Sequence, residues 1–141
     1  QGYLDRPEET AKTITAEGWL RTGDLGRMDE DGFVFVTGRI KELIIKGGEN
    51  IAPREVDEAL LEHNAVLEAA AFPRACKDYG QRVEACVCLK KGHNTDENEL
   101  REFCKNLIGA YKTPDRIYFL DDLPKGPSGK VQRMKLVDLT L

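Results

Sequence analysis

The sequence predicts an α+β fold: a small β-sheet covered by helices, with a β-hairpin at its N-terminal end. The chain of 141 residues, 40% of them hydrophobic, is long enough for one domain of ordinary size. From residue 42 onward, strand-like and helix-like patterns follow one another as hairpin, helix, two strands, helix, strand, loop and helix. This mixed order is typical of a sheet with helices packed on it.

Residues 1–38 are predicted to be a short, β-rich strip. Asp31-Gly32 precedes the β-prone run Phe33-Val34-Phe35-Val36, which favours a hairpin, and a helical signal is confined to the run Pro7-Glu8-Glu9-Thr10-Ala11. The strip carries 4 Lys/Arg against 8 Asp/Glu, and its hydrophobic content is too thin for an independent core. We therefore expect it to be the tail end of a larger domain.

The next elements are a hairpin and a helix. Leu43-Ile44-Ile45 predicts a short strand that ends at Gly47-Gly48, with Ile51 in its return partner. Pro53 presets the start of a helix. The apolar stripe of this helix consists of Val56, Ala59 and Leu60.

The remaining elements follow from periodicity and capping residues. Residues 66–72 and 82–90 are predicted strands, and one face of the second consists of Val83, Ala85, Val87 and Leu89. Asp96 is expected to cap a helix that Gly109 ends. Its predicted apolar stripe consists of Leu100, Phe103, Leu107 and Ile108. A strand from Arg116 to Leu120 and a short helix over 132–139 complete the prediction.

Composition excludes several classes of function. Residues 39–141 carry 17 Lys/Arg and 17 Asp/Glu, without the basic surface of a nucleic-acid binder, and no apolar run is long enough to span a membrane. The cysteines lack the paired spacing of a zinc site, so we expect no metal site and interpret them as reduced core thiols of a cytoplasmic protein. They are Cys76, Cys86, Cys88 and Cys104.

Two glycine- and lysine-containing segments, Gly38 to Pro53 and Pro124 to Arg133, are the candidate functional parts. In the second, glycine and proline place Lys130 on a loop. A phosphate-binding P-loop is excluded by spacing, because Gly126 and Gly129 are only three residues apart and Val131 follows the lysine. A plain solvated turn stays open as an alternative.

With these motifs the chain resembles the C-terminal portion of the acyl-CoA synthetase branch of the adenylate-forming superfamily, which also includes firefly luciferase and nonribosomal-peptide adenylation domains. The likeness covers nearly the whole chain, and the order of the motifs makes it specific. The motifs are Gly2-Tyr3-Leu4, Gly18-Trp19-Leu20-Arg21-Thr22-Gly23-Asp24, Gly38-Arg39-Ile40-Lys41-Glu42, Gly48-Glu49-Asn50-Ile51, Pro53-Arg54-Glu55-Val56, Tyr111-Lys112-Thr113-Pro114 and Ser128-Gly129-Lys130.

The resemblance implies an ATP-dependent acid:CoA ligase, which converts a carboxylic acid and ATP to acyl-AMP and pyrophosphate and then, with coenzyme A, to acyl-CoA and AMP. In this family a large N-terminal domain binds ATP, Mg²⁺ and the acid, and a small C-terminal lid rotates between the two steps. Residues 1–38 would then end the large domain, 39–41 would be the hinge, and 42–141 would be the lid. The lid's partner would be its own N-terminal domain.

The resemblance also implies roles for individual residues. Asp24 is expected to accept hydrogen bonds from the ribose hydroxyls of ATP, and Arg39 to approach the ribose and phosphates. Lys41 occupies the hinge position, although a solvated lysine would look the same. Gly47, Gly48 and Glu49 are expected to line the coenzyme A tunnel after rotation, and here ordinary turn glycines are the alternative.

Lys130 matches the family's adenylation lysine. Negative charge accumulates on the phosphoryl oxygens when the carboxylate attacks the α-phosphate, and a lysine cation stabilises that charge. At about 4 Å and an effective dielectric near 20, one such contact has a Coulomb energy of roughly 4 kcal/mol. Luciferase-like members carry a lysine six residues after the junction arginine. Here Ile45 stands at that position and Lys46 one place later, which disfavours an oxidative second step.

Two other functions stay open at this point. One is an adenylation domain that loads a carrier protein, and the other is a non-catalytic interaction module. Because the chain shows neither an acyl pocket nor the family's other phosphate loop, we expect it to be inactive by itself. The residues do not specify which carboxylic acid is activated.

Overall fold

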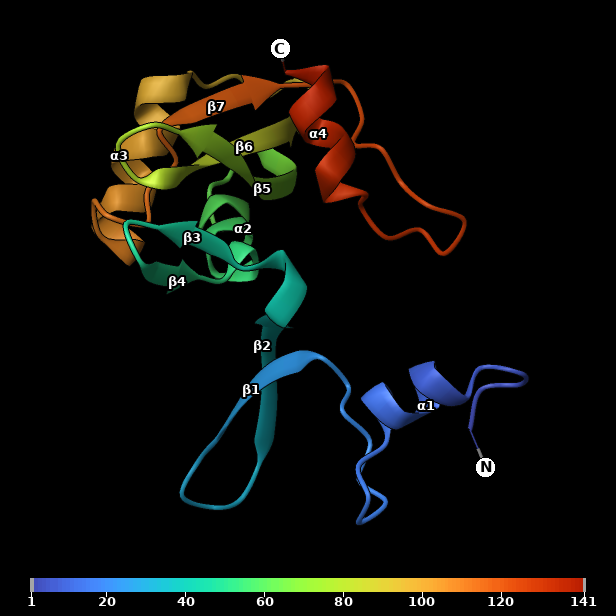
Figure 1. Cartoon of the computed structure of the whole chain (residues 1–141). Coiled ribbons are helices and arrows are strands. Elements are labelled where there is room, and N and C mark those ends of the chain that lie inside the picture. Colours follow the sequence, from blue (N-terminus) through green and yellow to red (C-terminus); the bar gives the residue numbers. More distant parts are fainter. Residues whose placement is uncertain (1, 141) are drawn as a thin grey trace. The chain divides into compact units, whose positions relative to one another are not determined.

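The computed structural model describes residues 2–140 and confirms the predicted α+β class (Figure 1). The chain divides into two compact units, which meet between Lys41 and Glu42. Among the described residues no helix is long and apolar enough to cross a membrane. The two units are described separately below.

The first unit consists of helix α1 (Pro7–Thr13) and an antiparallel hairpin of β1 (Asp24–Met28) and β2 (Val34–Arg39). The predicted hairpin is therefore confirmed. Its connection is organised by Asp29, whose Oδ1 accepts hydrogen bonds from the backbone N–H groups of Asp31 and Phe33, at 3.1 and 2.8 Å. An aspartate carboxylate that accepts from backbone N–H groups of the following residues stabilises a turn of this kind.

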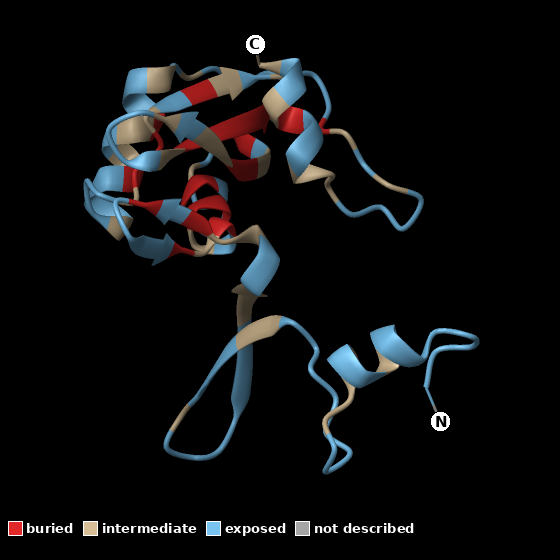
Figure 2. Cartoon of the chain, viewed as in Figure 1, coloured by how far each residue is buried: buried red, intermediate tan, exposed pale blue. Residues whose placement is uncertain are grey.

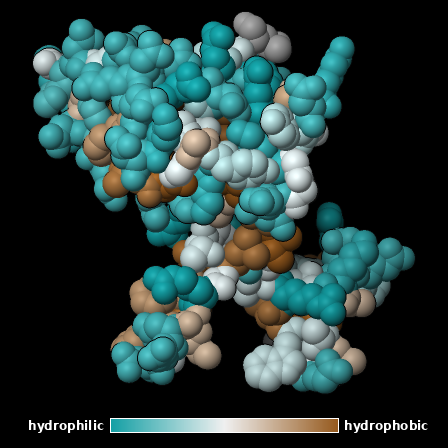
Figure 3. Space-filling view, turned by 90° about the vertical axis from the view of Figure 1, so that its left-hand side faces the viewer, coloured by the Kyte–Doolittle hydropathy of each residue, from teal (hydrophilic) through white to brown (hydrophobic). Residues whose placement is uncertain are grey.

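The first unit has no core of its own. None of residues 2–41 is buried, and Figure 2 shows buried segments only in the second unit. Large apolar side chains of the first unit lie on the surface, and the space-filling view shows hydrophobic residues among the hydrophilic ones (Figure 3). They include Tyr3, Trp19, Leu20, Phe33 and Val34. Exposed apolar surface of this extent is what we expect of a piece that packs against something else.

The second unit begins with the predicted hairpin, formed by β3 (Ile44–Lys46) and β4 (Glu49–Ile51). Gly47 and Gly48 have φ of +54° and +87°, so both central residues of this two-residue turn adopt the positive φ that tight hairpin turns require. Helix α2 (Pro53–Leu61) follows directly, with Pro53 in its first turn as predicted.

The sheet is built around β6 (Gly80–Leu89). It pairs antiparallel with β5 (Val66–Cys76) and parallel with β7 (Arg116–Phe119), and β3 joins its start where Lys46 pairs with Gly80. The two long strands extend further toward their shared turn than the sequence predicts. The predicted apolar face of β6 is confirmed, but Glu84, Cys86 and Cys88 on its other face are also buried.

Helix α3 (Glu97–Ile108) is capped as predicted. Asp96 accepts a hydrogen bond from the backbone N–H of Glu99 at 2.9 Å, and Gly109 ends the helix with φ +80°. The predicted apolar stripe is wrong at one position, because Leu107 is 48% exposed while Cys104 is fully buried. The side chains that face the core are spaced i, i+4 and i+8 from Leu100. Leu107, at i+7, lies beside this stripe.

The sheet has a hydrophobic core on each face. One core lies under α2 and α3, and the other lies under helix α4 (Arg133–Leu139) and the segment before it. The second core consists of Ala70, Phe72, Cys86, Cys88, Leu123 and Leu136. Cys86, Cys88 and Cys104 are buried free thiols, as the sequence predicts, and Cys76 is partly exposed. These two cores hold both the β3–β4 turn and the segment before α4 on one rigid body.

Candidate functional site

Asp24 and Arg39 lie together at the open end of the first hairpin. They are register partners of β1 and β2, and Arg39 Nε lies 3.1 Å from Asp24 Oδ1. The approach to Asp24 is also fixed locally, because its backbone N–H donates to Thr22 Oγ1 at 3.1 Å and Gly23 has φ +74°. Both side chains stay partly exposed. The two residues expected to contact the nucleotide therefore form one charged pair on one hairpin.

Lys41 lies where the two units meet. It is the middle residue of a 3₁₀ turn, η1 (Ile40–Glu42), and its side chain is exposed. A hinge needs only a few residues between elements that are themselves rigid. The position of Lys41 fits that requirement, and the role of hinge stays a prediction.

The two glycines of the turn between β3 and β4 have different surroundings. A Cβ on Gly47 would lie 3.1 Å from Tyr111 Oη and 3.3 Å from Tyr79 Cδ1, and the Gly47 N–H donates to the Tyr79 carbonyl at 2.9 Å. A Cβ on Gly48 would meet nothing within 4 Å, and Glu49 is exposed. Packing within the chain thus explains Gly47. Gly48 and Glu49 are free to meet a ligand, and the tunnel role stays a prediction for all three.

Lys46 is a structural residue that the sequence analysis did not identify. Only 7% of it is exposed, and its Nζ lies 3.2 Å from both the Tyr111 carbonyl and Asp115 Oδ2. The Tyr111 hydroxyl in turn donates to the Lys46 carbonyl. The signal was the alternation of a strand, which places Lys46 on the buried face and Ile45, 51% exposed, on the other.

Lys46 therefore cannot take the place of the lysine that luciferase-like members carry one position earlier. Its ammonium lies within 5.3 Å of the Tyr111 ring centroid and 6.0 Å of the Tyr79 ring centroid, inside the second unit. A cation held by a carboxylate, a carbonyl and two aromatic rings is committed to packing. This geometry is consistent with the expectation that an oxidative second step is disfavoured.

Lys130 lies on a small closed hairpin that precedes α4. Lys125 and Val131 form a β-bridge, Gly126 N–H donates to the Lys130 carbonyl at 2.8 Å, and Gln132 N–H donates to the Pro124 carbonyl at 2.8 Å. Gly129 has φ +76° and completes the turn. The Lys130 side chain is exposed and forms no ion pair with residues 2–140. The predicted loop around Lys130 is therefore closed by backbone hydrogen bonds, and Lys130 has no ion pair with residues 2–140.

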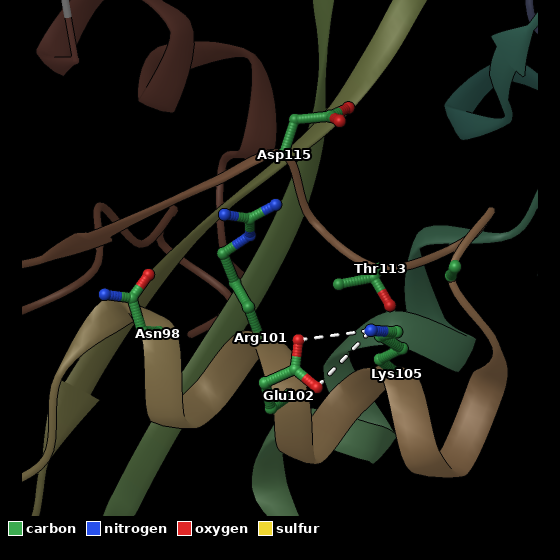
Figure 4. Close-up of a pocket in the computed structure, with 7 residues that line it drawn as sticks. Asn98, Arg101, Glu102, Lys105, Thr113 and Asp115 are labelled. Carbon is green, nitrogen blue, oxygen red and sulfur yellow. Dashed lines mark hydrogen bonds and ion pairs between the residues drawn. The ribbon is translucent and has the colours of Figure 1, made fainter.

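A separate surface pocket lies on α3 and the segment that follows it (Figure 4). Its lining consists of Asn98, Arg101, Glu102, Lys105, Ala110, Thr113 and Asp115. Its charged groups are already engaged within the chain: Lys105 lies 3.3 Å from Glu102, and Arg101 Nε donates to the Pro114 carbonyl at 3.0 Å. None of the predicted site residues lines this pocket, and we assign it no role in the chemistry.

Comparison with known proteins places these features in a family. Residues 55–130 match the family model described as the AMP-binding enzyme C-terminal domain. The sulfoacetate–CoA ligase of Cupriavidus necator is 53% identical over 97% of this chain, which spans 27% of that protein. The chain thus covers about a quarter of the length of this relative.

Solved structures give the same result. The amide bond synthetase McbA of Marinactinospora thermotolerans superposes with a TM-score of 0.94, at 35% identity over 100% of this chain and 29% of that one. ATP-bound MatB of Rhodopseudomonas palustris has a TM-score of 0.90 at 34% identity, over 100% of this chain and 29% of that one. Apo MatB, over 99% of this chain and 28% of that one, has a TM-score of only 0.75 at 35% identity. The chain therefore belongs to the AMP-binding enzyme C-terminal domain family of the adenylate-forming enzymes.

Proposed function

We propose that this chain is the C-terminal part of an ATP-dependent acid:CoA ligase. In this proposal residues 42–141 are the mobile lid, 39–41 are the hinge, and 1–38 end the large domain that binds ATP and the acid. The observation that carries the proposal is the Lys130 turn: a fixed backbone presents an ammonium without a partner among residues 2–140. Lys46, by contrast, is buried and paired with Asp115, which is the environment of a structural lysine.

The first half-reaction would use residues of both units. The carboxylate oxygen of the acid attacks the α-phosphorus, the bond to the bridging oxygen breaks, and pyrophosphate leaves with the electron pair. Lys130 would stabilise the charge that develops on the α-phosphoryl oxygens. Asp24 would hold the ribose hydroxyls through its second carboxylate oxygen, since Oδ1 is occupied by Arg39.

The second half-reaction would use the other end of the lid. The thiol of coenzyme A attacks the acyl carbonyl and AMP leaves, while the β3–β4 turn with Gly48 and Glu49 lines the path of the pantetheine arm. The apo and ATP-bound structures of MatB match this chain to different extents, with TM-scores of 0.75 and 0.90. Those two structures of MatB therefore differ in the region that corresponds to this chain.

Mg²⁺ would enter with ATP. Among residues 2–140 no group of three or more His, Cys, Asp or Glu side chains could hold a metal ion. In the proposal Mg²⁺ is bound, together with ATP, mainly by the large N-terminal domain.

Coenzyme A is favoured as the acyl acceptor because the chain is more similar in sequence to a CoA ligase than to an amide bond synthetase. The chain is 53% identical to a CoA ligase and 35% identical to the amide bond synthetase McbA. An amine or a carrier-protein thiol is the alternative acceptor. Incubating the full-length enzyme and a pre-made acyl-adenylate with coenzyme A or with a simple amine separates these functions by the product formed.

The central test compares Lys130→Ala with the full-length parent enzyme in each half-reaction. We expect the rate of adenylate formation, measured as pyrophosphate release, to fall by roughly 100-fold or more. This is the loss typical of removing one transition-state charge contact. Thioester formation from a pre-made acyl-adenylate should stay within about threefold of the parent rate, a change of less than 1 kcal/mol in the barrier. Equal losses in both half-reactions would contradict the proposed role. Lys91→Gln, a loss of an exposed lysine elsewhere on the second unit, is the matched control.

A further inference from the structure

Two other cations flank the turn that carries Lys130, Lys125 at its first arm and Arg133 at the start of α4, and their surroundings differ from those of Lys130. Lys125 lies five residues before Lys130, and Arg133 lies three residues after it. Both form ion pairs with carboxylates on the body of the second unit, whereas Lys130 forms none with residues 2–140. One unpaired cation thus lies between two paired ones.

Lys125 attaches the first arm of the turn to strand β5. Its Nζ lies 2.7 Å from Glu68 Oε1 and 3.1 Å from Asp122 Oδ1. The hydrogen bond to Glu68 is the main cause that raises the pKa of the Lys125 ammonium. Glu68 Oε2 is buried and has no hydrogen-bond partner among the described residues. The Glu68 carboxylate therefore depends on Lys125 as its countercharge.

Arg133 attaches the second arm to α2 and β5 together. Its guanidinium donates to both carboxylate oxygens of buried Asp57 and, at 2.9 Å, to the Ala71 carbonyl. Asp57 Oδ1 accepts in turn from the Ala71 N–H at 2.6 Å, which closes the network. Burial raises the pKa of the Asp57 carboxyl, so its ionised form depends on the arginine fork.

Arg133 also reaches the start of the second unit. Its Nε lies 3.5 Å from Glu42 Oε2, directly after the hinge candidate Lys41. The ion-pair partners of Lys125 and Arg133 all belong to the second unit, within residues 42–140. Both attachments therefore stay intact whichever way the second unit turns.

We propose that Lys125 and Arg133 are positioning residues for Lys130, which act by fixing both arms of its turn through Glu68 and Asp57. With both arms fixed and the turn closed by backbone hydrogen bonds, only the Lys130 side chain has freedom left to lose when it meets the phosphate. Preorganisation of this kind lowers the entropic part of a barrier. The inference rests on the proposed function of Lys130.

The competing explanation is that Lys125 contacts a phosphate itself. The two explanations differ at Glu68, which can influence the reaction only through Lys125. The experiment is a double-mutant cycle in the full-length enzyme with Lys125→Gln, Glu68→Gln and the double variant, measured in both half-reactions. Both side chains are about one-third exposed, at 35% and 33%, so the variants should fold.

We expect each single variant to lower kcat of adenylate formation by about three- to fivefold, in keeping with the modest strength of a partly exposed ion pair. The double variant should be no slower than either single variant, and KM for ATP and thioester formation from pre-made acyl-adenylate should not change. A slow Lys125→Gln variant beside a fully active Glu68→Gln variant would overturn the proposal in favour of direct contact. Equal slowing of both half-reactions would show a merely structural role.

Arg133→Lys tests the second attachment. It keeps the charge but loses the fork that binds Asp57 and Ala71 at once. We expect adenylate formation to slow by about tenfold, with the thioester step unchanged. If Arg133→Lys does not fold, the Lys125 cycle alone decides whether positioning is right.

Lys130→Ala separates the positioning role from the proposed function. If that variant is slow while the Lys125 cycle has no effect, positioning is wrong and the proposed function stands. If Lys130→Ala is fully active, the proposed function itself fails.

Discussion

Asp24 and Arg39 face each other across the β1–β2 hairpin, with 3.1 Å between carboxylate and guanidinium. The contact within the pair uses Oδ1 of Asp24, and the Asp24 side chain stays 30% exposed. Because an ionised carboxylate only accepts hydrogen bonds, this geometry suits a sugar hydroxyl, which donates.

Replacing Asp24 with Asn should impair recognition of the ribose in the full-length enzyme. We expect KM for ATP to rise by about tenfold, since a hydrogen bond to a charged group contributes about 1.5–3 kcal/mol. The preference for ATP over its 2′- and 3′-deoxy analogues should shrink in the same variant. Steady-state kinetics of pyrophosphate release with each nucleotide measure both effects. Glu30→Gln, an exposed carboxylate in the same hairpin, is the control, and an unchanged preference in Asp24→Asn would contradict a ribose contact.

The two glycines of the β3–β4 turn should respond differently to Ala. Both have positive φ, which costs an L-residue about 1 kcal/mol. Gly47→Ala adds a clash with Tyr111 and Tyr79, so we expect its total loss in unfolding free energy to reach roughly 2–3 kcal/mol. Urea denaturation of the two variants measures the difference.

The Gly48→Ala variant should also differ from the parent enzyme in the rate of one half-reaction. Gly48→Ala should slow thioester formation by severalfold and leave adenylate formation unchanged, because its Cβ would point into open space where the pantetheine arm would pass. If Gly48→Ala performs both half-reactions at the parent rate, the tunnel role of Gly48 is wrong.

Lys46→Met should affect stability rather than adenylation. The variant loses the hydrogen bonds from Nζ to Tyr111 and Asp115 but keeps the aliphatic stem, so we expect a loss of about 1–2 kcal/mol in unfolding free energy. Pyrophosphate release should stay near the parent rate. A folded Lys46→Met enzyme that has lost adenylate formation would instead indicate that Lys46 takes part in the chemistry.

The four thiols should differ in reactivity. Burial raises the pKa of Cys86 to about 12 and that of Cys104 to about 11, and it also raises the pKa of Cys88. At pH 8 a thiol reagent should therefore label Cys76 first, because that side chain is partly exposed, and should label all four only after unfolding. Mass spectrometry of the labelled chain gives the order, and fast labelling of Cys104 would contradict its burial.

The same shifts predict how stability depends on pH. Because burial raises the pKa of the Cys104 thiol in the folded chain, the unfolded chain loses this proton at a lower pH than the folded chain does. The free energy of unfolding is therefore unaffected by this group below pH 9 and decreases as the pH rises toward 11. For Cys104 the loss at pH 10.5 is about 2 kcal/mol. Cys104→Ala should start less stable at pH 8 and lose less between pH 8 and 10.5, as urea denaturation at both values would show. An equal loss in parent and variant would contradict this linkage.

Local signals predicted most of the fold. Pro53 began its helix, Asp96 and Gly109 bounded theirs, and Gly47-Gly48 formed a tight hairpin, because caps and turns depend on a few neighbouring residues. The prediction that Leu107 is buried was wrong, because the face that a helix buries depends on its packing partners as well as on its period.

Long-range pairs could not be predicted in the same way. Alternation along β6 suggests that Glu84 faces solvent, yet it is fully buried, with Arg74 Nε and Arg82 Nε each 2.8 Å from its carboxylate. Arg133 and Asp57 lie 76 residues apart in sequence, and Lys46 and Asp115 lie 69 apart. No periodicity relates residues at such separations, so only the folded chain reveals these ion pairs.

The motifs located the candidate site residues but not their surroundings. The resemblance named Asp24, Arg39 and Lys130 without indicating that the first two are paired and that the third has no ion-pair partner among residues 2–140. Which residues pair depends on hairpin register and on the packing of α4, both of which follow from the complete fold.

Because Lys125 and Arg133 draw their ion-pair partners from the same unit as Lys130, these ion pairs would be unchanged if that unit were attached to a different first unit. Grafted onto the acid-binding body of another enzyme, it would need to match only the docking surface and the short connecting strip. In the proposed function, an acid pocket in the large domain could then change while the contacts that support Lys130 stay the same.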